Sequence, residues 1–127
     1  MDTILLIESN VIILENFTEY FEMEGFKILS ACDGNKNAAT AMEFKLDLII
    51  SDIQMHEIID SPGLRQVVRG RRASAIPFIF TTTNSEKFDK LLALEFGADD
   101  YIIKPFSMEL LSEMARKWIK SGTKRHG

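Results

Sequence analysis

The hydrophobic positions of this chain fall into short continuous runs that alternate with segments of helical spacing. Five apolar runs predict strands at about 3–7, 27–31, 46–51, 77–82 and 100–103. Because these runs are nearly unbroken, they are typical of parallel strands covered on both faces. The segments between them predict helices at 11–24, 36–44, 61–71, 86–96 and 107–119. This strict alternation predicts an α/β fold, a doubly wound parallel sheet with five helices.

Capping signals set the ends of two of these helices. Asn10 is a suitable N-cap for the helix that begins at residue 11, and Gly25 follows its last apolar position. Ser61 and Pro62 have the pattern of an N-cap followed by the first helical residue. We therefore expect helices to begin at 11 and near 62.

Length and charge limit the classes of function. A chain of 127 residues forms one domain, and we expect it over 1–120, with 121–127 as a tail or the start of a linker. The net charge of −4 gives no electrostatic reason to bind DNA or RNA directly. No apolar run approaches a membrane helix and the N-terminus lacks a basic signal region, so we expect a cytoplasmic protein with no membrane contact. Cys32 is the single cysteine and cannot form an internal disulfide.

Four polar residues stand where four of the predicted strands end. They are Glu8, Asp52, Thr82 and Lys104. Parallel strands bring their carboxyl ends to the same edge of a sheet, where open α/β folds bind ligands. Two acids, a hydroxyl and an amine at one edge are suited to phosphoryl transfer to an aspartate. Since 81–83 are all threonine, the hydroxyl could be shifted by one residue to Thr81 or Thr83, although strand alternation and the spacing from Asp52 favour Thr82.

Four segments give the chain a specific resemblance. The runs 4–8, 46–55, 76–82 and 97–106, which read ILLIE, LDLIISDIQM, IPFIFTT and GADDYIIKPF, resemble the receiver domain of two-component response regulators. The likeness covers residues 3–119. It implies a flavodoxin-like sheet with strand order 2-1-3-4-5.

The resemblance also implies roles for individual residues. Asp52 would accept a phosphoryl group from a histidine kinase or a phosphotransfer protein, with Thr82 and Lys104 contacting the phosphoryl oxygens. Mg²⁺ would bind Asp52, the backbone carbonyl of Gln54 and, directly or through water, Glu8. The domain would catalyse its own phosphorylation and dephosphorylation without a separate substrate.

The same resemblance implies an output surface. Thr82 would draw Tyr101 inward and switch the surface of the fourth helix, fifth strand and fifth helix, through which an effector protein or a homodimer partner would bind.

Two departures from the family pattern bear on function. Receivers usually carry two adjacent acids after the first strand, and here the pair is Glu8 and Ser9. A missing unit charge beside Mg²⁺ predicts affinity lower by about tenfold or more, which Ser9→Asp should restore. The usual Met-Pro after the phosphoacceptor is Met55-His56, followed by a loop that is longer than usual and contains Ile58 and Ile59.

Three other functions fit parts of the pattern. A degenerate receiver that binds partners without phosphorylation is favoured by Ser9. A flavodoxin-like cofactor binder shares the fold, but Glu8 would repel a cofactor phosphate. A haloacid-dehalogenase type phosphatase would need an acid at position 54, where this chain has Gln54.

Overall fold

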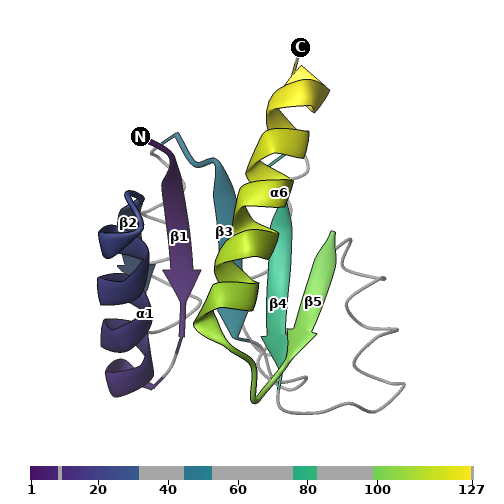
Figure 1. Ribbon diagram of the computed structural model, residues 1–127. Coiled ribbons are helices and arrows are strands. Elements are labelled where there is room, and N and C mark those ends of the chain that lie inside the picture. Colours follow the sequence, from purple (N-terminus) through teal and green to yellow (C-terminus); the bar gives the residue numbers. More distant parts are fainter. Residues whose placement is uncertain (9, 32–44, 53–75, 83–98, 127) are drawn as a thin grey trace.

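Five parallel strands form one sheet in the computed structural model of this protein (Figure 1). The structure describes residues 1–8, 10–31, 45–52, 76–82 and 99–126, the last five by their backbone alone. The strands are β1 (Thr3–Ile7), β2 (Lys27–Ala31), β3 (Leu48–Asp52), β4 (Phe78–Thr82) and β5 (Asp100–Ile103). Their order is β2-β1-β3-β4-β5, which confirms the predicted sheet.

Two strands begin slightly later than predicted. β3 begins at Leu48 and takes in Asp52, because residue 47 is held by hydrogen bonds to Thr3 instead: Asp47 N–H donates to the Thr3 carbonyl at 2.8 Å, and Asp47 Oδ2 accepts from Thr3 N–H at 2.8 Å. β4 begins after Pro77, which has no N–H to donate to a neighbouring strand. The carbonyl of Pro77 still accepts from Ile49 N–H at 3.0 Å.

The first helix, α1 (Val11–Met23), has the predicted caps. Asn10 Oδ1 accepts hydrogen bonds from the N–H groups of Ile12 and Ile13, at 3.0 and 3.1 Å. After the helix, Gly25 has a φ of 97°, a left-handed conformation that a residue with a Cβ rarely adopts. The chain can therefore turn directly from α1 into β2.

The last helix, α6 (Met108–His126), is longer than the predicted 107–119 and takes in most of the predicted tail. It begins after Ser107, whose Oγ accepts from Leu110 N–H at 3.1 Å. Beyond 119 no proline interrupts the helix, and Gly122 lowers helix stability by only about 1 kcal/mol. The predicted helices 36–44, 61–71 and 86–96 lie outside the described residues.

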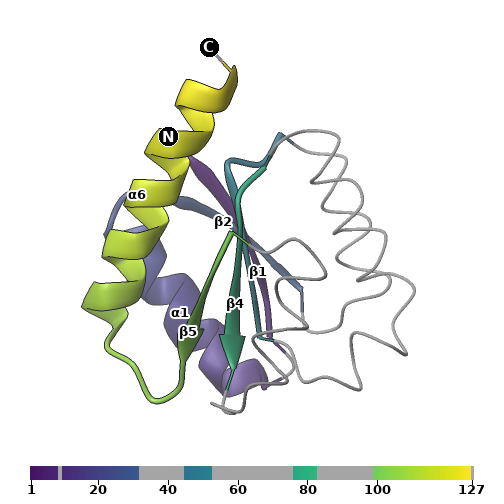
Figure 2. The same cartoon turned by 90° about the vertical axis from the view of Figure 1, so that its right-hand side faces the viewer.

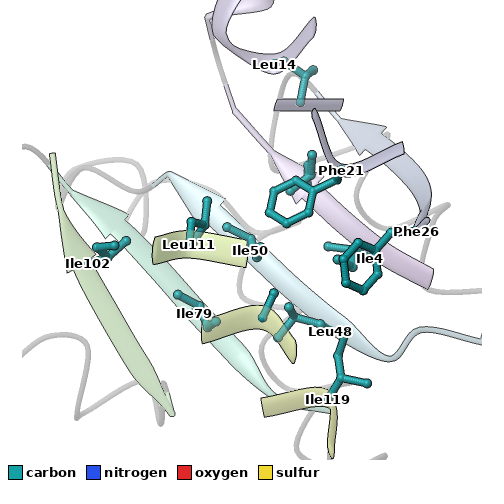
Figure 3. Close-up of a cluster of buried hydrophobic side chains, with 12 residues drawn as sticks. Ile4, Leu14, Phe21, Phe26, Leu48, Ile50, Ile79, Ile102, Leu111 and Ile119 are labelled. Carbon is teal, nitrogen blue, oxygen red and sulfur yellow. The ribbon is translucent and has the colours of Figure 1, made fainter. Parts of the chain in front are cut away.

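The helices α1 and α6 cover the same face of the sheet, as Figure 2 shows. Figure 3 shows the core between them, to which β1 and β3 each contribute two isoleucines or leucines at alternate positions, and β4 and β5 one isoleucine each. The fully buried members include Ile4, Phe21, Leu48, Ile79 and Leu111. In the described part of the chain, no helix is long and apolar enough to cross a membrane.

Arg116 of α6 ties the two helices together. Its guanidinium donates to the Glu24 carbonyl at 3.1 Å, forms an ion pair with the Glu24 carboxylate at 3.5 Å and lies 4.8 Å from the centre of the Phe26 ring. This contact links α6 to the end of α1, while the core holds the strands whose ends form the site described next.

Candidate functional site at the carboxyl edge of the sheet

Three of the predicted site residues meet at the carboxyl ends of the strands. Glu8 directly follows β1, Asp52 ends β3 and Lys104 directly follows β5. Backbone hydrogen bonds hold two of them: Glu8 N–H donates to the Ala31 carbonyl at 3.0 Å, and Lys104 N–H donates to the Thr82 carbonyl at 2.7 Å. These bonds fix the backbone positions from which the side chains of Glu8 and Lys104 extend.

The lysine lies between the two carboxylates. Lys104 Nζ is 3.1 Å from Asp52 Oδ1 and 3.6 Å from Glu8 Oε2. The exposed fractions of the side chains are 17% for Lys104, 14% for Asp52 and 4% for Glu8. Because all three are largely shielded from water, these charges interact more strongly than a pair on an open surface.

Glu8 has an unusual environment for a carboxylic acid. Burial raises its pKa to about 7, and the neighbouring Asp52 adds to the rise, while Lys104 and the N–H of Asn10 act in the opposite direction. No described group is hydrogen-bonded to Glu8 Oε2, although that atom is buried. In the metal-free protein the Glu8 carboxyl group therefore changes between its protonated and ionised forms near neutral pH.

The two threonines at the end of β4 lie on different faces of the sheet. Thr81 is the register partner of Asp52, and its Oγ1 lies 3.5 Å from Asp52 Oδ1, at the outer limit of a hydrogen bond. Thr82 is nine-tenths buried and is the register partner of Ile103. The Thr81 hydroxyl therefore lies beside the phosphoacceptor candidate, and Thr82 as the hydroxyl of the site stays a prediction.

Tyr101 shares a face of the sheet with Thr82. It is the register partner of Phe80, two residues before Thr82, and is half-buried. The preceding residue, Asp100, points to the opposite face, where its Oδ2 accepts from the indole N–H of Trp118 at 2.9 Å. The other oxygen of Asp100 accepts from Tyr101 N–H at 2.9 Å. The end of β5 that bears Tyr101 is thus connected to α6.

The described residues fit part of a magnesium site. Glu8 and Asp52 each supply a carboxylate oxygen beside Lys104 Nζ. The buried Oε2 of Glu8 lacks a hydrogen bond within the described structure. Mg²⁺ prefers oxygen ligands and retains water in its octahedral shell. Within the described ranges there is no cluster of three His, Cys, Asp or Glu. Gln54 and Ser9 lie outside those ranges, so Gln54 as a ligand stays a prediction.

Sequence comparison decides the family. A family model described as the response regulator receiver domain matches residues 4–116. The chain belongs to the response regulator receiver family. Among curated relatives of this receiver, response regulator SaeR of Staphylococcus aureus is 33% identical over 107 residues. That match covers 84% of the receiver and 46% of SaeR, so the chain spans about half the length of this relative.

Solved structures agree with this fold. The receiver domain protein from Methanospirillum hungatei, described as CheY-like, has a TM-score of 0.83 at 21% identity and covers 98% of both chains. The receiver domain of a signal transduction histidine kinase from Syntrophus aciditrophicus has a TM-score of 0.79 at 28% identity, covering 95% of this receiver and 92% of that chain. The predicted fold and the family that the four segments resemble are therefore confirmed, and receivers of this family take part in two-component signalling.

Proposed function

We propose that this receiver accepts a phosphoryl group on Asp52 from the phosphohistidine of a sensor kinase or phosphotransfer protein. A carboxylate oxygen of Asp52 forms a bond to phosphorus while the bond from phosphorus to the donor imidazole nitrogen breaks. The imidazole leaves with the bonding electron pair and Asp52 becomes an acyl phosphate. The receiver supplies the site for this step and has no separate substrate.

The observation that carries the proposal is the position of Lys104. Its ammonium lies 3.1 Å from Asp52 Oδ1, where it can offset the negative charge of both the attacking carboxylate and the incoming phosphoryl group. Preorganised charge of this kind acts most strongly in a shielded site. Lys104 thus orients Asp52 and, after transfer, holds a phosphoryl oxygen.

Magnesium would be held by Asp52, Glu8 and the backbone carbonyl of Gln54. When bound, Mg²⁺ supplies a second positive charge that reduces repulsion between carboxylate and phosphoryl oxygens. Glu8 must lose its proton to act as a ligand, since its pKa in the metal-free protein is about 7. Ser9 in place of a second acid makes the site weaker than in receivers with two acids.

The switch in this proposal connects Thr82 with Tyr101. Their shared face and diagonal placement on β4 and β5 support it. Thr82 would donate its hydroxyl to a phosphoryl oxygen, and Tyr101 would move inward behind it. The surface of the fourth helix, β5 and α6 would then change its affinity for an effector protein or a second copy. We place these events in the cytoplasm, where the histidine kinase partner presents its phosphoryl group.

A second function is favoured by the same lysine. Because Lys104 pairs with Asp52 and also approaches Glu8, the charges of the site are largely balanced without a metal ion. With Ser9 reducing metal affinity, the receiver could act as a partner-binding module that does not depend on phosphorylation.

Intact-mass measurement after incubation with acetyl phosphate and Mg²⁺ separates the two functions. Wild type should gain the mass of one phosphoryl group, Asp52→Asn should gain none, and Asp2→Asn, which alters an exposed acid, should behave as wild type. Equal labelling of wild type and Asp52→Asn would refute phosphorylation at Asp52. No labelling of wild type at any magnesium concentration would favour the partner-binding module.

A further inference from the structure

A groove of about 560 Å³ is lined by residues of α1 and by Ser30 of strand β2. We call it the α1–β2 groove. Val11 and Leu14 form its apolar part, and Thr18 and Ser30 add hydroxyl groups. None of its lining residues belongs to the strand-end site.

Three glutamates line the same groove. Glu15, Glu19 and Glu22 are exposed, and none forms an ion pair within the described structure. The nearest acid along the helix, Glu24, is the one that pairs with Arg116. Residues 11–24 contain no lysine or arginine, so nothing on α1 offsets this charge.

The placement of these acids does not favour the helix. Glu15 and Glu19 are four residues apart, and Glu19 and Glu22 three apart, spacings at which like charges repel across a helix surface. Glu22 also lies in the last turn, where the helix dipole disfavours negative charge. A cationic partner would relieve both effects, which is the charge complementarity expected of a docking surface.

The sheet edge beside the groove indicates the shape of that partner. Among the described strands, β2 pairs only with β1, so its other edge can accept an additional strand. Ser30 lines the groove and Ile28, on the same face of β2, packs against the core beneath α1. In an added strand every second side chain would point to this face, toward the glutamates. The groove runs from Val11 to Glu22, about 16 Å of helix, which equals about five residues of extended chain.

We propose that the α1–β2 groove binds an extended peptide segment of a partner protein that carries lysine or arginine at alternate positions and pairs with β2. This surface is separate from the phosphoryl site. The Asp52→Asn variant should therefore bind such a segment as wild type does, and failure of the proposed phosphorylation would leave this inference standing.

The test uses the full chain and the peptide acetyl-Lys-Val-Lys-Val-Lys-amide, followed by amide chemical shifts and titration calorimetry. Saturable shifts should appear in α1 and β2. The triple variant Glu15→Gln, Glu19→Gln, Glu22→Gln should weaken binding at least tenfold. The matched control Glu109→Gln, Glu113→Gln changes two exposed acids of α6 and should leave the affinity unchanged.

Three outcomes would overturn the proposal. The first is no saturable binding, and the second is equal affinity for acetyl-Lys-Lys-Val-Val-Lys-amide, which has the same composition without alternation. The third is dimerisation of the free chain that the triple variant abolishes, since the groove would then be occupied by a second copy.

Discussion

Two buried hydroxyl groups on neighbouring strands, those of Ser51 and Thr81, differ in what surrounds them. Thr81 Oγ1 lies 3.5 Å from a carboxylate oxygen of Asp52. Ser51 directly precedes Asp52 and is fully buried, but its Oγ has no hydrogen-bond partner in the described structure. A buried hydroxyl without a partner loses its hydration and gains nothing in return.

Ser51→Ala should therefore raise the free energy of unfolding by about 1 kcal/mol, because it removes a group that folding desolvates. Urea denaturation followed by circular dichroism measures this difference. Ser30→Ala, at an exposed position of β2, should change stability by less than about 0.5 kcal/mol. A clear loss of stability in Ser51→Ala would show that the Ser51 hydroxyl has a partner.

Glu8 should make the stability of the metal-free protein depend on pH. Its pKa is about 7 in the folded protein and 4.5 in an unperturbed acid, so between these values the unfolded chain releases a proton that the folded chain keeps. The free energy of unfolding should therefore fall as pH rises from about 4.5 to about 7. Urea denaturation in EDTA across this range measures the effect. Glu8→Gln should flatten this part of the pH profile, and an identical profile in the variant would contradict the assignment.

At the scale of elements, Gly25 sets how α1 joins β2. Its φ of 97° costs a residue with a Cβ roughly 1–2 kcal/mol. A Cβ placed at this position would have no atom within 4 Å, so the cost of Gly25→Ala should come from the backbone conformation and not from a clash. Thermal denaturation should show this loss, and Gly25→Asn should lose less because asparagine tolerates left-handed backbone better. Equal stability of Gly25→Ala and wild type would refute this explanation.

Among the described elements, the sequence predicted which segments form strands and helices better than it predicted where they end. Apolar runs placed all five strands, and Asn10 and Gly25 fixed both ends of α1. The end of α6 could not be predicted in the same way, because 120–126 has neither a proline nor an apolar pattern.

The part of the candidate site that is formed by residues at strand ends could be predicted from the sequence. Glu8, Asp52 and Lys104 follow from the meeting of parallel strands at one edge. The faces on which Thr81 and Thr82 lie do not follow from the strand ends. Their side chains alternate between faces, so the register with β3 is needed to assign them.

At the scale of the whole molecule, β5 connects the site to α6. Lys104 follows β5 directly, Tyr101 lies within it, and Asp100 at its start accepts the indole N–H of Trp118. A change at the site can therefore reach both faces of the sheet through one strand. Such a change shifts the population of states only if an interaction differs between them.

Beryllofluoride, which mimics an acyl phosphate, should test this coupling. We expect it to perturb the amide chemical shifts of Tyr101 and of 86–96, and to leave 11–24 largely unchanged. Thr82→Ala should bind beryllofluoride and Mg²⁺ but transmit much less of this change, whereas Thr81→Val should transmit it. A full response in Thr82→Ala, or shifts confined to the surroundings of Asp52, would refute a switch that acts through Thr82.

Locating the phosphoryl group on the chain shows whether Asp52 is the residue that accepts it. Borohydride reduces an acyl phosphate to an alcohol, so phosphorylation followed by reduction and peptide mass spectrometry converts the modified aspartate to homoserine. We expect homoserine at position 52 alone, and none when Mg²⁺ is removed by EDTA. Homoserine at Asp47, Asp99 or Asp100, or an unmodified position 52 in a labelled protein, would contradict it.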